Sequence, residues 1–103
     1  MSGLAFRAGG ERFAVPIHEV REAARLGHLA PLPGAPARLT GLTFVRGEPL
    51  GVVDIGVVMG TASGSARMLV VLEGRPWALL VDHVEGIVGD DVPLLDIANL
   101  IGG

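Results

Sequence analysis

The chain has 103 residues, of which 50% are apolar and none is cysteine, and its formal net charge is −3. A chain of this length and apolar content builds one domain with a hydrophobic core, which excludes intrinsic disorder, while the lack of cysteine excludes disulfides and thiolate chemistry. Its eight basic residues are all arginines spread among the acids and only 4% of its residues are aromatic, which argues against a nucleic-acid-binding surface.

The first predicted element is a β-hairpin around Gly9-Gly10. At the period of a β-strand, one face of residues 4–8 carries Leu4, Phe6 and Ala8, and one face of the return segment 11–17 carries Phe13, Val15 and Ile17. Pro16 has no N–H to donate to a neighbouring strand, so we expect it at a sheet edge or at the exit of the second strand.

The segment Ile17–Gly27 has two interpretations. Its apolar residues are spaced like the buried face of a helix, and its closing glycine would cap a helix of about ten residues. The family resemblance described below favours one helical turn at His18–Val20 followed by a strand. In both cases Val20 lies beside Glu22 near the end of an element. Glu22 is a candidate for partner binding, because interfaces combine apolar anchors with charged rims.

A second hairpin is predicted within Pro31–Ile55. The apolar runs Gly41–Val45 and Leu50–Ile55 flank a Gly- and Pro-containing turn at residues 46–49, which presents Arg46 at its bend. Arg46 is either a solvated turn residue or an arginine held rigidly enough to bind a partner's carboxylate or backbone carbonyls.

A third hairpin joins Met68–Leu72 to Trp77–Val81, the longest unbroken apolar runs of the chain, through Glu73-Gly74-Arg75-Pro76. At five residues each, these runs are far shorter than the roughly 20 residues that a membrane-spanning helix needs. Asp82–Val88 is expected to extend the second strand, with Asp82 as an end or kink. Residues 61–66 are small and polar and predict a surface loop.

Two segments in the second half of the chain share one sequence pattern. Asp54–Gly60 predicts a short helical turn capped by its aspartate, and Asp96–Gly102 repeats the same pattern of Asp-Ile, two variable residues, two apolar residues and Gly. The repeat suggests two similar β-units packed in one molecule. Many short strands with Gly-rich turns and little helix predict an all-β fold, either small barrels or a sandwich.

Residues that could carry catalysis do not form a recognisable set. No two histidines are spaced as metal ligands on one element, and the Gly-rich residues 60–65 lack the lysine of a phosphate-binding loop. Ser63 and Ser65 have no strand-to-helix elbow around them. The sequence leaves open whether two carboxylates converge in the fold as a pair for general acid–base catalysis. We therefore expect no enzyme activity, no cofactor and no metal.

An ordered series of segments covers residues 3–101: Gly10-x-x-Phe-Ala-Val-Pro-Ile, Val20-Arg-Glu, Pro31-Leu-Pro-x-x-Pro, Gly41-Leu-x-x-Val-Arg-Gly, Val52-Val-Asp-Ile, Leu79-Leu-Val-Asp-x-Val and Leu94-Leu-Asp-Ile. This series resembles the CheW-like family, the coupling proteins of bacterial chemosensory arrays. The resemblance implies two SH3-like β-barrels around a shared core. It also implies a non-enzymatic cytoplasmic adaptor between the tip of a chemoreceptor and a CheA-type histidine kinase.

By matching positions, the resemblance places partner binding at five residues: Val20, Glu22, Gly41, Arg46 and Gly47. For the two glycines the alternative is that they act only by setting the backbone shape. The N-terminus shows no secretory signal, which agrees with a cytoplasmic protein. A different class of function, a stand-alone regulatory barrel that binds a small ligand or another protein, is the alternative to the adaptor.

The chain departs from the family pattern at three places. Phe44 stands where the family usually has Asn, and Gly51 replaces a common Pro. Only residues 89–93 separate Val88 from Leu94, where family members have about two or three further strands. We therefore expect one barrel to be truncated, receptor binding to be kept and direct kinase binding to be weak or lost, as in a shortened coupling protein of the Frz motility type.

Overall fold

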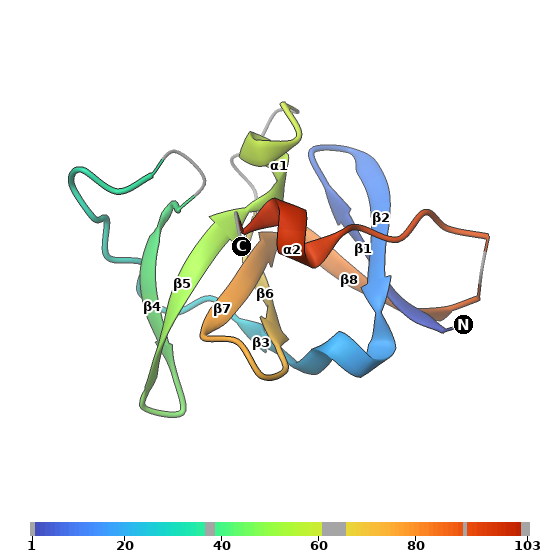
Figure 1. Cartoon of the computed structure of the whole chain (residues 1–103), viewed down its shortest axis with the longest axis horizontal. Helices are drawn as coiled ribbons and strands as arrows, with labels where there is room; N and C mark the ends of the chain where they lie inside the picture. Colours follow the sequence, from blue (N-terminus) through green and yellow to red (C-terminus); the bar gives the residue numbers. More distant parts are fainter. Residues whose placement is uncertain (1, 37–38, 61–65, 90, 102–103) are drawn as a thin grey trace.

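The computed structural model describes residues 2–36, 39–60, 66–89 and 91–101, which form two β-sheets and three short helical turns (Figure 1). One sheet has three strands in the order β2-β1-β8, with β1 at Gly3–Ala8, β2 at Glu11–Pro16 and β8 at His83–Val88. The other sheet has five strands in the order β3-β6-β7-β5-β4. Its strands are β3 Val20–Arg25, β4 Gly41–Val45, β5 Glu48–Asp54, β6 Met68–Leu72 and β7 Trp77–Val81. The turns are η1 Ile17–Glu19, α1 Ile55–Val58 and α2 Ile97–Leu100.

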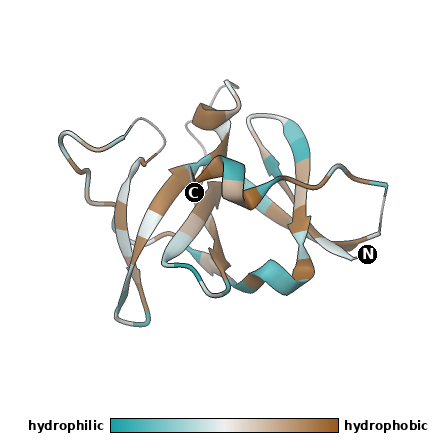
Figure 2. Ribbon diagram, in the orientation of Figure 1, coloured by the Kyte–Doolittle hydropathy of each residue, from teal (hydrophilic) through white to brown (hydrophobic). Residues whose placement is uncertain are grey.

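The central strands of the five-stranded sheet are buried on both faces. On one face, alternate residues form a core within the five-stranded unit: Leu50, Val52, Leu69, Val71, Ala78 and Leu80. On the other face, the intervening residues pack in a second core shared with the three-stranded sheet: Val53, Val70, Leu72, Leu79 and Val81. This double burial explains why these strands read as continuous apolar runs, and Figure 2 shows the hydrophobic colour along β5 and β7.

The five-stranded sheet closes on itself through the segment that follows β3. The backbone N–H of Leu26 still donates to Arg67 beside β6, at 2.8 Å. The chain then crosses to β4, where Ala30 and Leu42 exchange two backbone hydrogen bonds of 2.8 Å each. The two edge strands β3 and β4 are thereby connected, which gives the SH3-like barrel that the resemblance implied.

The three-stranded sheet is the truncated unit. Phe6 and Phe13 face each other across β1 and β2, with ring centroids 6.1 Å apart, and both belong to the shared core. Along the outer edge of β2, Leu95 donates its N–H to the carbonyl of Ala14 at 2.8 Å. In the described part of the chain no strand pairs with the outer edge of β8. The short connection after β8 therefore leaves an open sheet.

The structure decides between the two interpretations of Ile17–Gly27. A long helix is wrong, because η1 covers only Ile17–Glu19 and residues 20–25 form β3, as the resemblance indicated. Pairing with β6 supplies the backbone hydrogen bonds for this segment, so tertiary contacts override a helix-like spacing of apolar residues.

The predicted extension of β7 through Asp82–Val88 is also wrong. The chain bends at Asp82 and leaves the five-stranded sheet, so that β8 pairs with β1 in the other sheet. The carboxylate of Asp82 accepts a hydrogen bond of 3.0 Å from the N–H of Gly9, and its own N–H donates to Arg7. The expectation that Asp82 ends a strand is confirmed.

The three predicted hairpins and the two capped turns are confirmed. Asp54 caps α1 by accepting from the N–H of Val57, and Asp96 caps α2 by accepting from the N–H of Asn99, both at 3.3 Å. The predicted surface loop lies mostly outside the described residues. None of the described helices has the length and apolar character that crossing a membrane would require.

Candidate functional site

The bend between β4 and β5 is a two-residue turn that contains Arg46 and Gly47. Val45 pairs directly with Glu48, and both turn residues have positive φ angles of 53° and 79°. Positive φ at both positions is the signature of a type I′ turn, whose twist matches that of the flanking strands. The bend is tighter than the four-residue turn expected from the sequence, because Glu48 and Pro49 already belong to β5.

Arg46 is held by Glu22 on β3. Its Nε lies 3.2 Å from each carboxylate oxygen of Glu22, and this hydrogen-bonded ion pair raises the pKa of Arg46. The Arg46 side chain is 80% exposed, whereas that of Glu22 is 23% exposed. Neither terminal nitrogen of Arg46 donates to a described residue, so the guanidinium can still bind a carboxylate or carbonyl from outside.

A second ion pair lies beside the first. The Nη1 of Arg21 donates to Glu48 at 2.5 Å, and its Nε lies 4.0 Å from the carboxylate of Glu73 in the β6–β7 turn. The β3–β6 register shifts between Val20 and Glu22, which puts Arg21 in a β-bulge. A bulge re-aims a side chain, so the adjacent Arg21 and Glu22 both reach the β4–β5 hairpin although regular strand residues would point to opposite faces.

Sequence reasoning missed Arg21 and Glu48 as members of this site. The available signal was a pair of neighbouring opposite charges on β3 and another pair, Arg46 and Glu48, two residues apart at the bend. Nothing in the sequence indicated the bulge that lets both pairs form.

The other two predicted residues have different surroundings. Val20 begins β3, is half-buried and packs against the shared core. Gly41 is buried at the far end of β4 from the turn, beside the Ala30–Leu42 bridge that closes the barrel. The structure thus brings Glu22 to Arg46 and Gly47 at the bend, with Val20 two residues before Glu22 on β3, and it separates Gly41 from them.

An exposed apolar pair adjoins the charged residues. Phe44 lies directly opposite Pro49 across the hairpin, and at 67% it is the most exposed large hydrophobic side chain in the described residues. Figure 2 shows the hydrophilic colour at the bend between β4 and β5. An apolar anchor beside a charged rim is the usual composition of a protein–protein interface.

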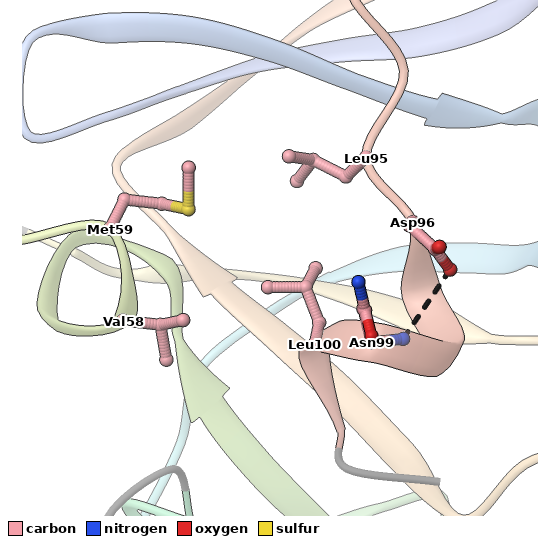
Figure 3. Close-up of a pocket in the computed structure, with 6 residues that line it drawn as sticks. All are labelled: Val58, Met59, Leu95, Asp96, Asn99 and Leu100. Atoms are coloured by element: carbon pink, nitrogen blue, oxygen red, sulfur yellow. Dashed lines mark hydrogen bonds between the residues drawn. The ribbon is translucent and has the colours of Figure 1, made fainter.

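A pocket of about 340 Å³ lies away from this surface, between α1 and α2. It is lined by apolar side chains and by two polar residues of the second capped turn: Val58, Met59, Leu95, Leu100, Asp96 and Asn99 (Figure 3). The carboxylate of Asp96 is occupied by its capping hydrogen bond. Across the described ranges, no group of three or more His, Cys, Asp or Glu side chains converges as a metal site would require.

Comparison with known families identifies the fold and the lineage. The profile of the CheW-like domain family matches residues 2–102. This chain belongs to that family. It is 34% identical to the Chemotaxis protein CheW of Rhizobium meliloti, over 93% of this chain and 68% of the relative. It is 37% identical to Protein FrzA of Myxococcus xanthus, over 84% and 52% of the two chains, and 32% identical to Protein PilI of Pseudomonas aeruginosa, over 88% and 49%.

The CheW-like fold is also seen in a solved structure. The crystal structure of the scaffolding protein TtCheW from Thermoanaerobacter tengcongensis matches with a TM-score of 0.71 at 22% identity, over 84% of this chain and 63% of that one. This CheW-like chain therefore spans about half the length of FrzA and PilI and less than two thirds of TtCheW. The relatedness to FrzA is consistent with a shortened CheW-like protein of the Frz type.

Proposed function

We propose that this CheW-like chain is a non-enzymatic cytoplasmic adaptor that binds the signalling tip of a chemoreceptor. Its partner-binding surface is formed by Val20 and Glu22 on β3 and by Arg46 and Gly47 at the bend, while Gly41 acts through the backbone. The observation that carries the proposal is the exposed Arg46, fixed by a two-residue turn and by Glu22.

A fixed arginine suits protein recognition better than a freely moving one. Ordering a long side chain on binding costs free energy, and here the turn and the Nε contact to Glu22 already restrict Arg46 before a partner arrives. Its two terminal nitrogens form a planar pair of donors that can bind a carboxylate or carbonyl of the partner. The exposed Phe44 and Pro49 supply apolar area beside them.

We propose further that direct binding to a CheA-type kinase is weakened or lost. An adaptor needs separate surfaces for receptor and kinase, and a second closed barrel would provide one of them. In the described residues the second unit is an open three-stranded sheet ending at β8. The missing strands thus favour an adaptor that keeps receptor binding.

The test is isothermal titration of the full chain with a receptor cytoplasmic signalling domain and, separately, with the regulatory domain of a CheA-type kinase. We expect binding to the first and little or none to the second. Arg46→Glu reverses the charge at the bend and should lower receptor affinity at least tenfold, as loss of an interface arginine commonly does. Arg25→Glu, the same charge change on β3 outside the site, is the matched control.

Arg46→Asn separates the turn from the charge, because asparagine tolerates the positive φ of this position. This variant should keep the circular dichroism spectrum and the melting temperature while it loses receptor binding. Unchanged affinity in both Arg46 variants would make the arginine a turn residue only. Tight kinase binding without receptor binding would contradict the narrower proposal.

One observation favours the alternative, a stand-alone regulatory domain that binds a small ligand. The pocket between α1 and α2 has apolar walls with Asp96 and Asn99 at one side, which is the usual composition of a small-molecule site. A thermal-shift screen with a metabolite panel tests this alternative, since a ligand that binds only the folded state raises the melting temperature.

A further inference from the structure

Two ion pairs join β3 to the β4–β5 hairpin, and the element that supplies the positive charge differs between them. In one, β3 supplies the carboxylate of Glu22 and the hairpin supplies Arg46; in the other, β3 supplies Arg21 and the hairpin supplies Glu48. We propose that Arg21 and Glu48 are positioning residues, whose ion pair sets the orientation of the bend and thereby the affinity of Arg46 for a partner. This inference rests on the proposed function.

The first support is the place of Glu48 in the chain. It directly follows Gly47 and pairs with Val45, so it is the residue that closes the turn. A side chain that fixes Glu48 against β3 therefore restricts the turn itself. Of the two pairs, the Arg21–Glu48 contact at 2.5 Å is shorter than the 3.2 Å contacts between Arg46 and Glu22.

The second support is the exposure of the hairpin. β4 is the last strand in its sheet, and the preceding segment contacts it through the Ala30–Leu42 bridge and through the Thr43 hydroxyl, which donates to the carbonyl of His28 at 2.7 Å. The bend at Arg46 and Gly47 extends beyond the residues that these contacts hold. A single ion pair at Arg46 would leave it able to pivot, whereas two pairs contact the hairpin on both sides of Gly47.

The third support is the bulge at Arg21. Because the β3–β6 register shifts at this residue, Arg21 and Glu22 reach the same hairpin although they are adjacent in sequence. The bulge gives up one regular backbone pairing in β3. Arg21 also lies within 4.0 Å of Glu73 in the β6–β7 turn, which ties the arginine itself to a second hairpin. Glu48, the closest of these carboxylates, contributes most to raising the pKa of Arg21.

The experiment is a double-mutant cycle with Arg21→Gln, Glu48→Gln and the double variant, titrated against the receptor signalling domain. Each single variant should lower affinity about two- to fivefold, the range that an exposed ion pair supports. The double variant should lose no more than either single variant, because both substitutions remove the same interaction. Arg75→Gln, which removes the Arg75–Glu19 pair of 3.7 Å at the other hairpin, is the matched control and should bind as the unchanged chain does.

A second measurement needs no partner. Backbone ¹⁵N order parameters of Arg46 and Gly47 should fall in Glu48→Gln from about 0.85, typical of rigid backbone, toward about 0.6, and should not change in Arg75→Gln. Unchanged order parameters in Glu48→Gln would overturn the positioning role, as would affinity losses that add in the double variant. If neither the unchanged chain nor any variant binds the receptor domain, the proposed function fails. The order parameters alone then decide whether the Arg21–Glu48 ion pair positions the bend.

Discussion

A methyl group placed on Gly41 would lie 2.5 Å from the carbonyl oxygen of Ala30. This approach is closer than real Cβ atoms show, and it occurs where the Ala30–Leu42 bridge closes the five-stranded barrel. The fold itself therefore requires glycine at this position. Any effect of a Gly41 substitution on partner binding would therefore be explained by displacement of β4, without contact between Gly41 and the partner.

Gly41→Ala should destabilise the protein by about 1–3 kcal/mol, because the added methyl forces backbone atoms of the closing bridge apart. The measurement is urea unfolding followed by circular dichroism. Gly27→Ala is the matched control, since a Cβ there meets nothing within 4 Å, and it should leave stability unchanged or slightly raised. Equal stability of the two variants would show that the bridge accommodates a side chain.

Phe6→Ala should cost about 3–5 kcal/mol, because Phe6 is fully buried against Phe13 in the core shared by the two sheets. Phe44→Ala removes the same side chain from the exposed face of the hairpin and should change stability by no more than about 0.5 kcal/mol. Thermal unfolding of both variants checks this contrast. A large loss in Phe44→Ala would mean that this aromatic packs within the fold.

The pH dependence of stability should include a contribution from Glu85. Arg12 and Arg7 each donate to its carboxylate, at 2.6 and 2.7 Å, and these hydrogen bonds lower the pKa of Glu85 below its usual value of 4.5. A lowered folded-state pKa means that the contribution is complete above the unfolded value and is lost as the pH falls through the folded one. Arg7 and Arg12 are directly opposite in the sheet, so protonation also leaves two facing cations.

Glu85→Gln should accordingly be less stable than the unchanged chain at about pH 7, and this difference should shrink as the pH is lowered below about 4. Urea unfolding at both pH values measures it. Added salt should also reduce the difference, because these side chains are partly exposed. A difference that grows on acidification would contradict the assignment.

Asp54→Ala and Asp96→Ala should each cost about 1 kcal/mol, the usual effect of removing an N-cap. The larger loss is expected for Asp54, because it is buried and its capping hydrogen bond is partly shielded from water, whereas that of Asp96 is exposed. The asparagine variants keep an acceptor oxygen and serve as controls. Similar losses in the alanine and asparagine variants would indicate that charge, rather than capping, stabilises the turns.

The local elements followed from sequence patterns wherever the cause is itself local. The Gly9-Gly10 and Arg46-Gly47 turns and the Asp54 and Asp96 caps depend on backbone preferences of a few neighbouring residues. The segment Ile17–Gly27 shows the limit, because its apolar spacing fits a helix and only the pairing of β3 with β6 makes it a strand.

The candidate site also combines features with local causes and features that depend on contacts between distant parts of the chain. The amino-acid sequence by itself determined that Arg46 sits at a tight bend, that Glu22 follows an apolar residue and that no set of catalytic groups is apparent. Only the tertiary structure decided that β3 meets this hairpin across the closed barrel and that Arg21 and Glu48 form the second ion pair. The reason is physical: a turn is fixed by the torsion angles of its own residues, whereas a bulge and a barrel closure depend on hydrogen bonds between strands far apart in the chain.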